Sequence, residues 1–257
     1  MCYDTCFIAP LENIKLHFPD LIFDELMYHN PFDSVHIVGH AFPNHPIVYK
    51  NRDDKHLHCT LMEWGIIPYY IKDEASFLKQ RVTMLNARSE RILNDTKSYW
   101  HTIRNRRCLI PLTGIYEHRE IKGWKKKVPY FITIKNEPLF YLPALYSVAQ
   151  LPDTNTGEVL KRFTYTLVTT KANIVMQHIH NNGNNAGRMP LFMPLSMAKQ
   201  WLQEDLSIHN YQHLLNYQLP SKALAYTPVY TIRTTKERPD GKLKNECYAW
   251  EQLPELM

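Results

Sequence analysis

The chain has 257 residues, of which 44% are hydrophobic and 21% are charged, and its formal net charge is +5. This length is enough for one large domain or two small ones, and the composition is that of a soluble globular protein. No apolar run reaches the length of a membrane-spanning segment, so a membrane partner is excluded, whereas the mild positive charge is compatible with a polyanionic partner.

The expected elements are short and rich in strands. In the first half we expect strands at 3–8, 34–38 and 61–67, helices near 10–18, 73–80 and 97–107, and an extended segment at 82–88. In the second half we expect strands at 108–111, 114–117, 128–134, 139–146, 163–169, 189–193 and 225–230, and short helices at 172–178, 195–204 and 211–215. With no linker and no repeat, this pattern predicts one α+β domain over 1–257, with a polar tail or hairpin at about 236–257.

The five cysteines are scattered along the chain, at Cys2, Cys6, Cys59, Cys108 and Cys247. Their odd number, their spacing and the lack of a signal sequence predict reduced thiols in the cytoplasm. No Cys-x-x-Cys or His-Glu-x-x-His spacing is present, so we expect neither a metal nor another cofactor.

Cys2 differs from the other cysteines because it follows the initiator methionine. Cytosolic aminopeptidases generally remove Met1 before a residue as small as cysteine, which would leave Cys2 with a free α-amine beside its thiol. Since these groups have reference pKa values of roughly 7.7–8.0 and about 8.5, both are partly deprotonated near neutral pH. The amine can form an imine with an aldehyde, and the sulfur can then close a thiazolidine ring.

Three further stretches combine residue types that catalysis or nucleic-acid binding uses. Trp64 precedes a glycine and predicts an exposed aromatic side chain followed by a tight turn. Asn86 and Arg88 are two residues apart, which places them on one side of an extended segment. Glu117 ends an apolar strand. Each also has a purely structural explanation, as a core aromatic residue, turn and surface residues, or a solvated carboxylate.

Histidine and basic residues form the remaining candidates. His178 and His180 follow a predicted helix, and Arg188 precedes a predicted strand. Arg107 ends a basic cluster with Arg104 and Arg106. A lysine-rich run at 122–127 could contact phosphates or could be a solvated hairpin tip.

Together these stretches resemble one family, SRAP, the SOS-response-associated peptidase family that senses abasic sites in DNA. The resemblance covers Cys2 to about Pro194, with a continuation to Tyr230. It rests on motifs in the family's order: Met1-Cys2, Trp64-Gly65-Ile66-Ile67-Pro68, Asn86-Ala87-Arg88-Ser89-Glu90, Arg107-Cys108-Leu109-Ile110-Pro111, Gly114-Ile115-Tyr116-Glu117, and His180 before Arg188-Met189-Pro190. It implies a fold of mostly antiparallel β-structure around a barrel-like core with peripheral helices, in a monomer.

The resemblance also implies a function and roles for single residues. Family members crosslink to abasic sites in single-stranded DNA through a thiazolidine on the N-terminal cysteine, and the same cysteine is credited with removing its own methionine. Cys2 would react, Glu117 would act as acid and base, His180 would donate a proton to open the sugar ring, and Asn86 would hold Cys2 or the lesion. The predicted DNA contacts are a phosphate contact by Arg88, base stacking by Trp64, and contacts by Arg107 and Arg188.

The chain departs from the family pattern at three places. Tyr3 and Asp4 replace the common Gly-Arg after the cysteine, His118 replaces a tryptophan, and an Asn/Gly-rich insertion at 181–187 separates His180 from Arg188. The insertion leaves His178 as an alternative to His180.

Two other functional classes remain open at this point. The first is a cysteine hydrolase that uses Cys2, His180 and Asn86 on other peptides or amides. The second is a non-covalent single-stranded nucleic-acid-binding module in which Cys2 takes no part.

Overall fold

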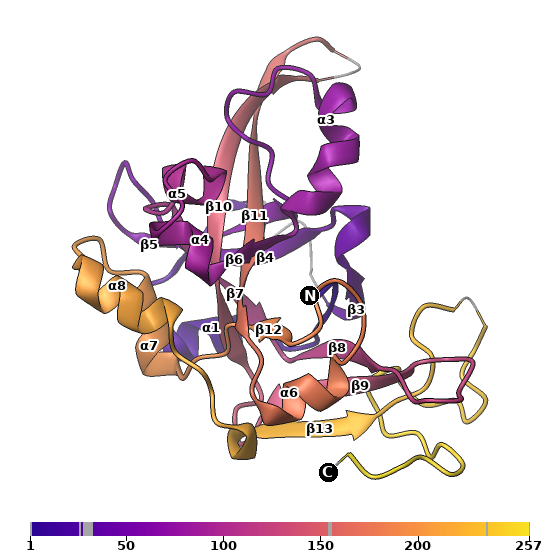
Figure 1. The fold of residues 1–257 in the computed structure, drawn as a ribbon. Helices are drawn as coiled ribbons and strands as arrows, with labels where there is room; N and C mark the ends of the chain where they lie inside the picture. The colour runs from indigo at the N-terminus through magenta and orange to yellow at the C-terminus, as the bar shows by residue number, and fades with distance from the viewer. Residues whose placement is uncertain (1, 26, 28–32, 154–155, 235, 257) are drawn as a thin grey trace.

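The strands of the computed structural model, which describes residues 2–25, 27, 33–153, 156–234 and 236–256, form two sheets (Figure 1). The first sheet is antiparallel and has the order β13-β9-β8-β1-β3. Its strands are β1 (Asp4–Phe7), β3 (Ser34–Val38), β8 (Gly114–Arg119), β9 (Val128–Ile134) and β13 (Leu224–Pro228). Because β1 lies between β8 and β3, the strand that follows Cys2 is held on both sides.

The second sheet closes into a barrel. Its order is β12-β11-β10-β7-β4-β5-β2, with β6 paired to β11. Its strands are β2 (Ile22–Phe23), β4 (Asn44–Lys50), β5 (Leu57–Trp64), β6 (Asn86–Arg88), β7 (Arg107–Leu112), β10 (Phe140–Pro152), β11 (Val159–Lys171) and β12 (Arg188–Pro190). Since β5 also pairs with β11, the strands β11, β10, β7, β4 and β5 form a closed ring. This confirms the expected α+β fold with a barrel-like core.

The helices lie around the outside of the strands (Figure 1). They are α1 (Glu12–His17), α3 (Glu74–Arg81), α4 (Ser89–Leu93), α5 (Tyr99–Thr102), α6 (Ile174–Ile179), α7 (Leu195–Trp201) and α8 (Ile208–Leu215). Helix α3 begins as the sequence predicts, because the Asp73 side chain accepts hydrogen bonds from the backbone N–H groups of Ala75 and Ser76.

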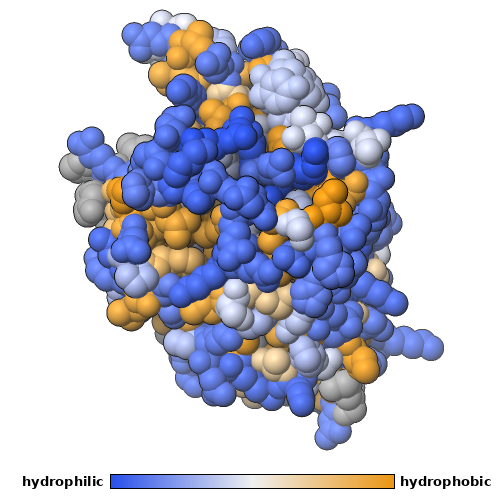
Figure 2. Space-filling model, turned by 90° about the vertical axis from the view of Figure 1, so that its left-hand side faces the viewer, coloured by the Kyte–Doolittle hydropathy of each residue, from blue (hydrophilic) through white to orange (hydrophobic). Residues whose placement is uncertain are grey.

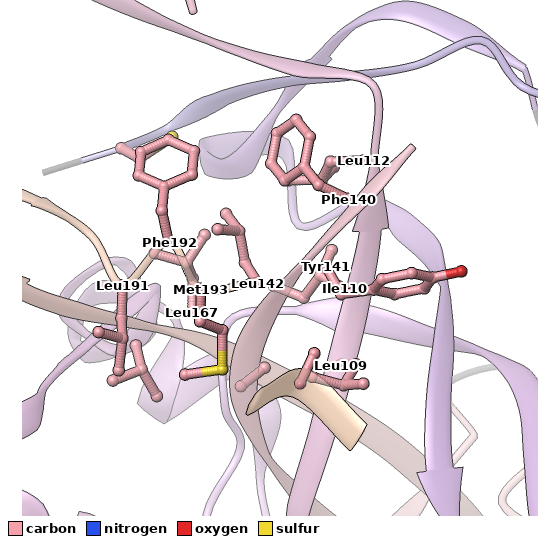
Figure 3. Packing of buried hydrophobic residues seen from close by; sticks show 14 of the residues in the cluster. Leu109, Ile110, Leu112, Phe140, Tyr141, Leu142, Leu167, Leu191, Phe192 and Met193 are labelled. Carbon is pink, nitrogen blue, oxygen red and sulfur yellow. The ribbon is translucent and has the colours of Figure 1, made fainter. Parts of the chain in front are cut away.

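Apolar side chains from both sheets share one large core, and two smaller apolar clusters lie beside it. Figure 3 shows the part between β7, β10 and the segment after β12, where Phe140 and Phe192 lie with ring centroids 5.7 Å apart. Every residue of β7 is buried, which explains why this strand reads as a continuous apolar run rather than an alternating one.

Two expected elements differ from the structure. No strand was expected at 44–50, where Pro46 is typical of a loop, but β4 is present and β7 pairs with it only at Val48 and Tyr49. Pro46 therefore has a paired strand on one side only, where a missing N–H is tolerated. The helix expected at 97–107 ends at Thr102, because Arg107 already belongs to β7 and pairs with Leu145 of β10.

The chain after β13 is docked beside the β8–β9 hairpin (Figure 1, yellow). The Val229 N–H donates to Pro129 O at 2.9 Å, Trp250 Nε1 donates to Val229 O, and Ile232 is buried against β1 and β8 residues. Within the expected polar tail, the Arg238 guanidinium donates to three backbone carbonyls.

The face that Figure 2 shows carries mainly hydrophilic side chains with smaller hydrophobic groups between them. Within the described part of the chain, no helix is both long and apolar enough to cross a membrane.

Candidate active site

Cys2 is fully buried at the start of β1, where the two sheets meet. Its thiol lies 3.5 Å from Asp4 O. Burial, followed by the negative charges of Glu117 and Asp4, raises the pKa of the Cys2 thiol well above its ordinary value. The thiol is therefore protonated at neutral pH in this conformation.

Asn86 links Cys2 to the barrel sheet. Its strand β6 runs parallel to β11, with Asn86 beside Leu167, and its side-chain amide donates to Cys2 O at 3.1 Å. The amide oxygen, Oδ1, is buried and has no hydrogen-bond partner among the described residues. A buried acceptor without a donor is costly, so this atom can bind a donor beside Cys2.

Glu117 reaches the same place from β8. Asp4 pairs with Tyr116, so in this antiparallel register Glu117 lies opposite Tyr3, one residue from Cys2. Its carboxyl group is buried, and Oε1 has no hydrogen-bond partner among the described residues. Burial raises the pKa of the Glu117 carboxyl, and the nearby His180 opposes this shift.

His180 follows α6 directly, and both its ring and its backbone are held by neighbouring backbone groups. Its Nδ1 lies 3.0 Å from Arg188 O, and its backbone N–H donates to Met176 O at 2.8 Å. His180 is 9% exposed and lines the same cleft as Glu117, whereas His178 is exposed on α6 and is not among the lining residues. Of the two histidines, the structure therefore brings His180 to the carboxyl group.

The cleft has a volume of about 380 Å³. Its lining residues are Tyr3, Asp4, Glu117, His118, Lys127, His180, Asn182, Gly183, Asn184, Asn185 and Arg233. The inserted loop crosses to the β8–β9 connection, where Asn181 makes two hydrogen bonds with the Glu120 backbone and Asn182 accepts one from Lys127. The insertion thus forms one wall of the cleft without displacing His180.

Two of the predicted arginines lie at the edge of this region. Arg88 is exposed, and one guanidinium nitrogen donates to Asn185 Oδ1 at 3.3 Å. Arg188 instead makes a bidentate ion pair with Glu90, at 2.7 and 3.0 Å, and donates to Thr169 O. The Arg188 guanidinium therefore holds α4 against β11, and its backbone carbonyl positions His180.

The expectation of an exposed Trp64 is wrong. The indole is 1% exposed, its N–H donates to Leu85 O at 2.8 Å, and its ring stacks on Tyr165 with a centroid distance of 5.9 Å. Gly39 packs so closely that an added Cβ would lie 3.1 Å from the ring. With both faces covered, Trp64 cannot stack on a base in this conformation. The expected turn is present, since Gly65 has φ +98°.

Arg107, which the sequence predicts as a DNA contact, is instead mostly covered by protein. Arg107 is 8% exposed and donates hydrogen bonds to the carbonyls of Trp201, Gln203 and Glu204. These carbonyls lie at the C-terminal end of α7, where a cation offsets the partial negative charge of the helix end. The basic cluster therefore contains a structural arginine.

Sequence reasoning missed two features near these motifs. Arg233 lines the cleft and pairs with the buried Asp4, and no local motif marks it. Tyr69 and Tyr70 are more than half exposed and form an aromatic group with Tyr99, whose hydroxyl accepts a hydrogen bond from the Tyr69 N–H. The sequence itself indicates this aromatic group, because two tyrosines directly follow Pro68 in a loop.

No group of three or more His, Cys, Asp or Glu side chains among the described residues is arranged to hold a metal ion. His58 lies within hydrogen-bond distance of Asp24 and Asp54. The functional groups at and around Cys2 are one thiol, one carboxyl, one imidazole and one amide. This combination suits proton transfer and nucleophilic attack.

Comparisons with known proteins identify the family of this chain. The model of the SRAP family, described as SOS response associated peptidase, matches residues 14–232. "Abasic site processing protein YoqW" of Bacillus subtilis (strain 168) is 30% identical over 172 residues, which are 67% of this chain and 69% of that protein. "Abasic site processing protein HMCES" of Gallus gallus is 25% identical over 190 residues, which are 66% of this chain and 52% of that protein.

Solved structures show the same fold. A protein from Bacteroides thetaiotaomicron superposes with a TM-score of 0.76 at 25% identity, covering 95% of this chain and 97% of that one. A protein from Bordetella bronchiseptica, 17% identical, has a TM-score of 0.69 over 90% of this chain and all of the other. The family match extends over most of the chain and includes Asn86, Glu117 and His180. The chain therefore belongs to the SRAP family.

Proposed function

We propose that this protein recognises abasic sites in single-stranded DNA and traps them covalently through Cys2 after Met1 has been removed. The observation that carries the proposal is the pair of buried acceptor atoms beside Cys2, Asn86 Oδ1 and Glu117 Oε1, which have no hydrogen-bond partner among the described residues. An α-amine at Cys2 would supply the missing donors. The names of the relatives, which call them abasic site processing proteins, support the same substrate.

The chemistry consists of two bond-forming steps. An abasic deoxyribose exists as a closed hemiacetal in equilibrium with a minor open aldehyde. The Cys2 amine adds to the aldehyde carbon and the carbinolamine loses water, which leaves an imine. The Cys2 sulfur then attacks the imine carbon and the thiol proton passes to nitrogen, so the product is a thiazolidine and the net loss is one water.

The neighbouring groups suit these steps. A carboxyl group whose pKa is raised by burial can both donate a proton to the leaving water and accept one from the amine, which is the role we assign to Glu117. His180, held at the cleft wall, would protonate the ring oxygen as the sugar opens. Asn86 would orient Cys2 through its hydrogen bond to the Cys2 carbonyl.

The raised pKa of the Cys2 thiol favours this order of events over a thiolate hydrolase. Cysteine hydrolases attack with a thiolate and lower the pKa of the thiol to form it. Here the amine acts first, and the thiol needs to react only once the imine is present. Removal of Met1 by the same site would be one self-processing event, and it is required because an acylated amine cannot form an imine.

Contacts to the rest of the strand come from exposed groups. Arg88 would bind a phosphate, a role supported by its exposure and by its hydrogen bond to Asn185 of the inserted loop. Tyr69 and Tyr70, rather than Trp64, offer exposed aromatic faces on which a base can stack.

The test is a crosslinking assay with protein lacking Met1 and a single-stranded oligonucleotide that carries one abasic site. We expect a denaturant-stable adduct whose intact mass equals protein plus DNA less one water. Cys2→Ala should form no adduct while retaining single-strand binding. Cys247→Ser is the matched control, because Cys247 is an exposed free thiol away from the cleft, and its adduct yield should equal that of the wild type.

Three outcomes would contradict the proposal. If the Cys2→Ala variant forms an adduct, another residue is the one that reacts with the abasic site. Multiple turnover on an added peptide or amide, without an adduct, would identify a hydrolase. Salt-sensitive DNA binding without any adduct, from protein confirmed to lack Met1, would identify a non-covalent binding module.

A further inference from the structure

The cleft contains an ion pair between residues far apart in the chain. Asp4, two residues after Cys2, is 2% exposed. Its carboxylate accepts hydrogen bonds from Arg233 Nε at 3.1 Å and Arg233 Nη2 at 2.6 Å, and it lies 2.8 Å from His36 Nε2. Although burial alone would raise the pKa of Asp4, these partners outweigh it and the pKa lies below its ordinary value. Asp4 is therefore a fixed negative charge that binds one edge of a guanidinium group.

Arg233 belongs to the docked C-terminal segment and lies one residue beyond the family match, which ends at residue 232. Its position is set by the neighbouring Ile232, which is buried with Cys6, Tyr116 and Val229. The segment that carries Arg233 is thus anchored on β1, which begins two residues after Cys2, and on β8, which carries Glu117. This anchoring restricts the guanidinium to the mouth of the cleft.

Half of the Arg233 side chain remains available. Its side chain is 47% exposed, and it lines the cleft together with Glu117 and His180. Asp4 occupies Nε and Nη2, whereas Nη1 has no hydrogen-bond partner among the described residues. A guanidinium held at one edge by a carboxylate loses little conformational freedom when its other N–H groups bind a second anion. Phosphate oxygens are the anions for which this geometry is best suited.

We propose that Arg233 is a DNA-binding residue that contacts the phosphate next to the reacting sugar, with Asp4 as the residue that orients it. This inference rests on the proposed function, because it assumes that single-stranded DNA enters the cleft. It assigns to the C-terminal segment a part of the binding site that lies outside the matched family region. Lys127, which also lines the cleft, is already paired with Glu120 and Asn182 and is the less available cation.

The experiment measures DNA binding and crosslinking in parallel. Binding uses a single-stranded oligonucleotide with a tetrahydrofuran abasic analogue, which lacks an aldehyde, over a range of salt concentrations. Arg233→Gln should weaken binding several-fold at low salt and reduce the slope of log K against log salt by about 0.7, the value for one phosphate contact on a single strand. Arg233→Lys keeps the charge and should keep the slope, with an intermediate affinity.

Arg162→Gln is the matched control. Arg162 is a part-exposed arginine paired with Glu63 and Glu74, and it is not among the residues that line the cleft. The control removes one positive charge and breaks an ion pair, and its salt slope should equal that of the wild type. Thermal unfolding of every variant is measured alongside, so that lost stability is separated from lost binding.

The outcomes are distinguishable. If the wild type crosslinks natural abasic DNA but Arg233→Gln keeps its affinity and slope, this inference is overturned and the proposed function stands. If Arg233→Gln unfolds at lower temperature and crosslinks more slowly with an unchanged slope, Arg233 is only structural and the inference is again overturned. If the wild type neither binds nor crosslinks the DNA, the proposed function fails and the inference fails with it.

Discussion

Glu117 shows how the environment of one residue sets its chemistry. Its carboxyl group lies at the end of an apolar strand, where a solvated side chain was one explanation of the sequence. In the structure the group is buried, and burial raises its pKa. The folded state therefore binds the proton more tightly than the unfolded state, in which the pKa is about 4.3.

This shift predicts the pH dependence of stability at Glu117. A raised folded pKa contributes stability that is present below the unfolded pKa and is lost as pH rises through the folded pKa. Glu117→Gln has no such proton to lose, so the free energy of unfolding of the variant minus that of the wild type should rise as pH increases above the unfolded pKa of about 4.3. Urea unfolding at several pH values measures the difference, with exposed Glu251→Gln as the control. A constant difference between the two proteins across this range would contradict the prediction.

At the scale of elements, arginines that look alike in the sequence have different functions because of where the strands and helices place them. Arg88 leaves β6 at the surface, Arg188 joins α4 to β11, and Arg107 caps the C-terminal end of α7. Sequence spacing identified all three as basic residues near family motifs. Only the packing of α7 on β7 and β10 shows that the Arg107 guanidinium faces backbone carbonyls.

Arg107→Ala should therefore lower stability rather than change DNA contacts. The substitution removes the donors from three backbone carbonyls, of which the Trp201 carbonyl is buried, and we expect a loss of about 2–4 kcal/mol in the free energy of unfolding. Arg88→Ala should change stability by less than about 0.5 kcal/mol while weakening DNA binding and reducing its salt slope. Denaturant unfolding and salt-dependent binding separate the two effects. Wild-type stability in Arg107→Ala together with a reduced slope would restore Arg107 as a DNA contact.

At the scale of the whole molecule, the cleft forms where the antiparallel sheet meets the barrel. Cys2 and Glu117 come from the first sheet, Asn86 comes from a strand paired to the barrel, and His180 follows a helix between β11 and β12. The docked C-terminal segment adds Arg233. Any motion between these parts would separate the candidate site residues, so the geometry of the site depends on the stability of the entire assembly.

Ile232→Ala tests whether the C-terminal segment belongs to the same cooperative unit. Ile232 is 1% exposed, and we expect its truncation to cost about 2–4 kcal/mol in the free energy of unfolding. Ile208→Ala, at a position that is 69% exposed, should cost less than about 0.5 kcal/mol. We expect one unfolding transition in calorimetry, shifted to lower temperature in Ile232→Ala. A separate early transition with an unchanged main one would show that the segment unfolds by itself.

The sequence by itself was sufficient for the fold class, for most strand positions and for naming the candidate site residues that belong to local motifs. Strand β9 begins and ends where its apolar run predicts, and Asn86, Glu117 and His180 were identified because each lies in a short motif. These features are local: alternation, turn residues and motif spacing depend on neighbours within a few positions along the chain.

The tertiary structure alone decided which of those side chains face one another and which are covered. Trp64 is buried because Gly39 and Tyr165 pack on its faces, and Arg107 is buried because α7 ends above it. Asp4 and Arg233 meet across 229 positions of sequence, and no spacing rule predicts such a pair. Burial and long-range pairing depend on the sum of all packing contacts, so they become visible only when the complete chain has folded.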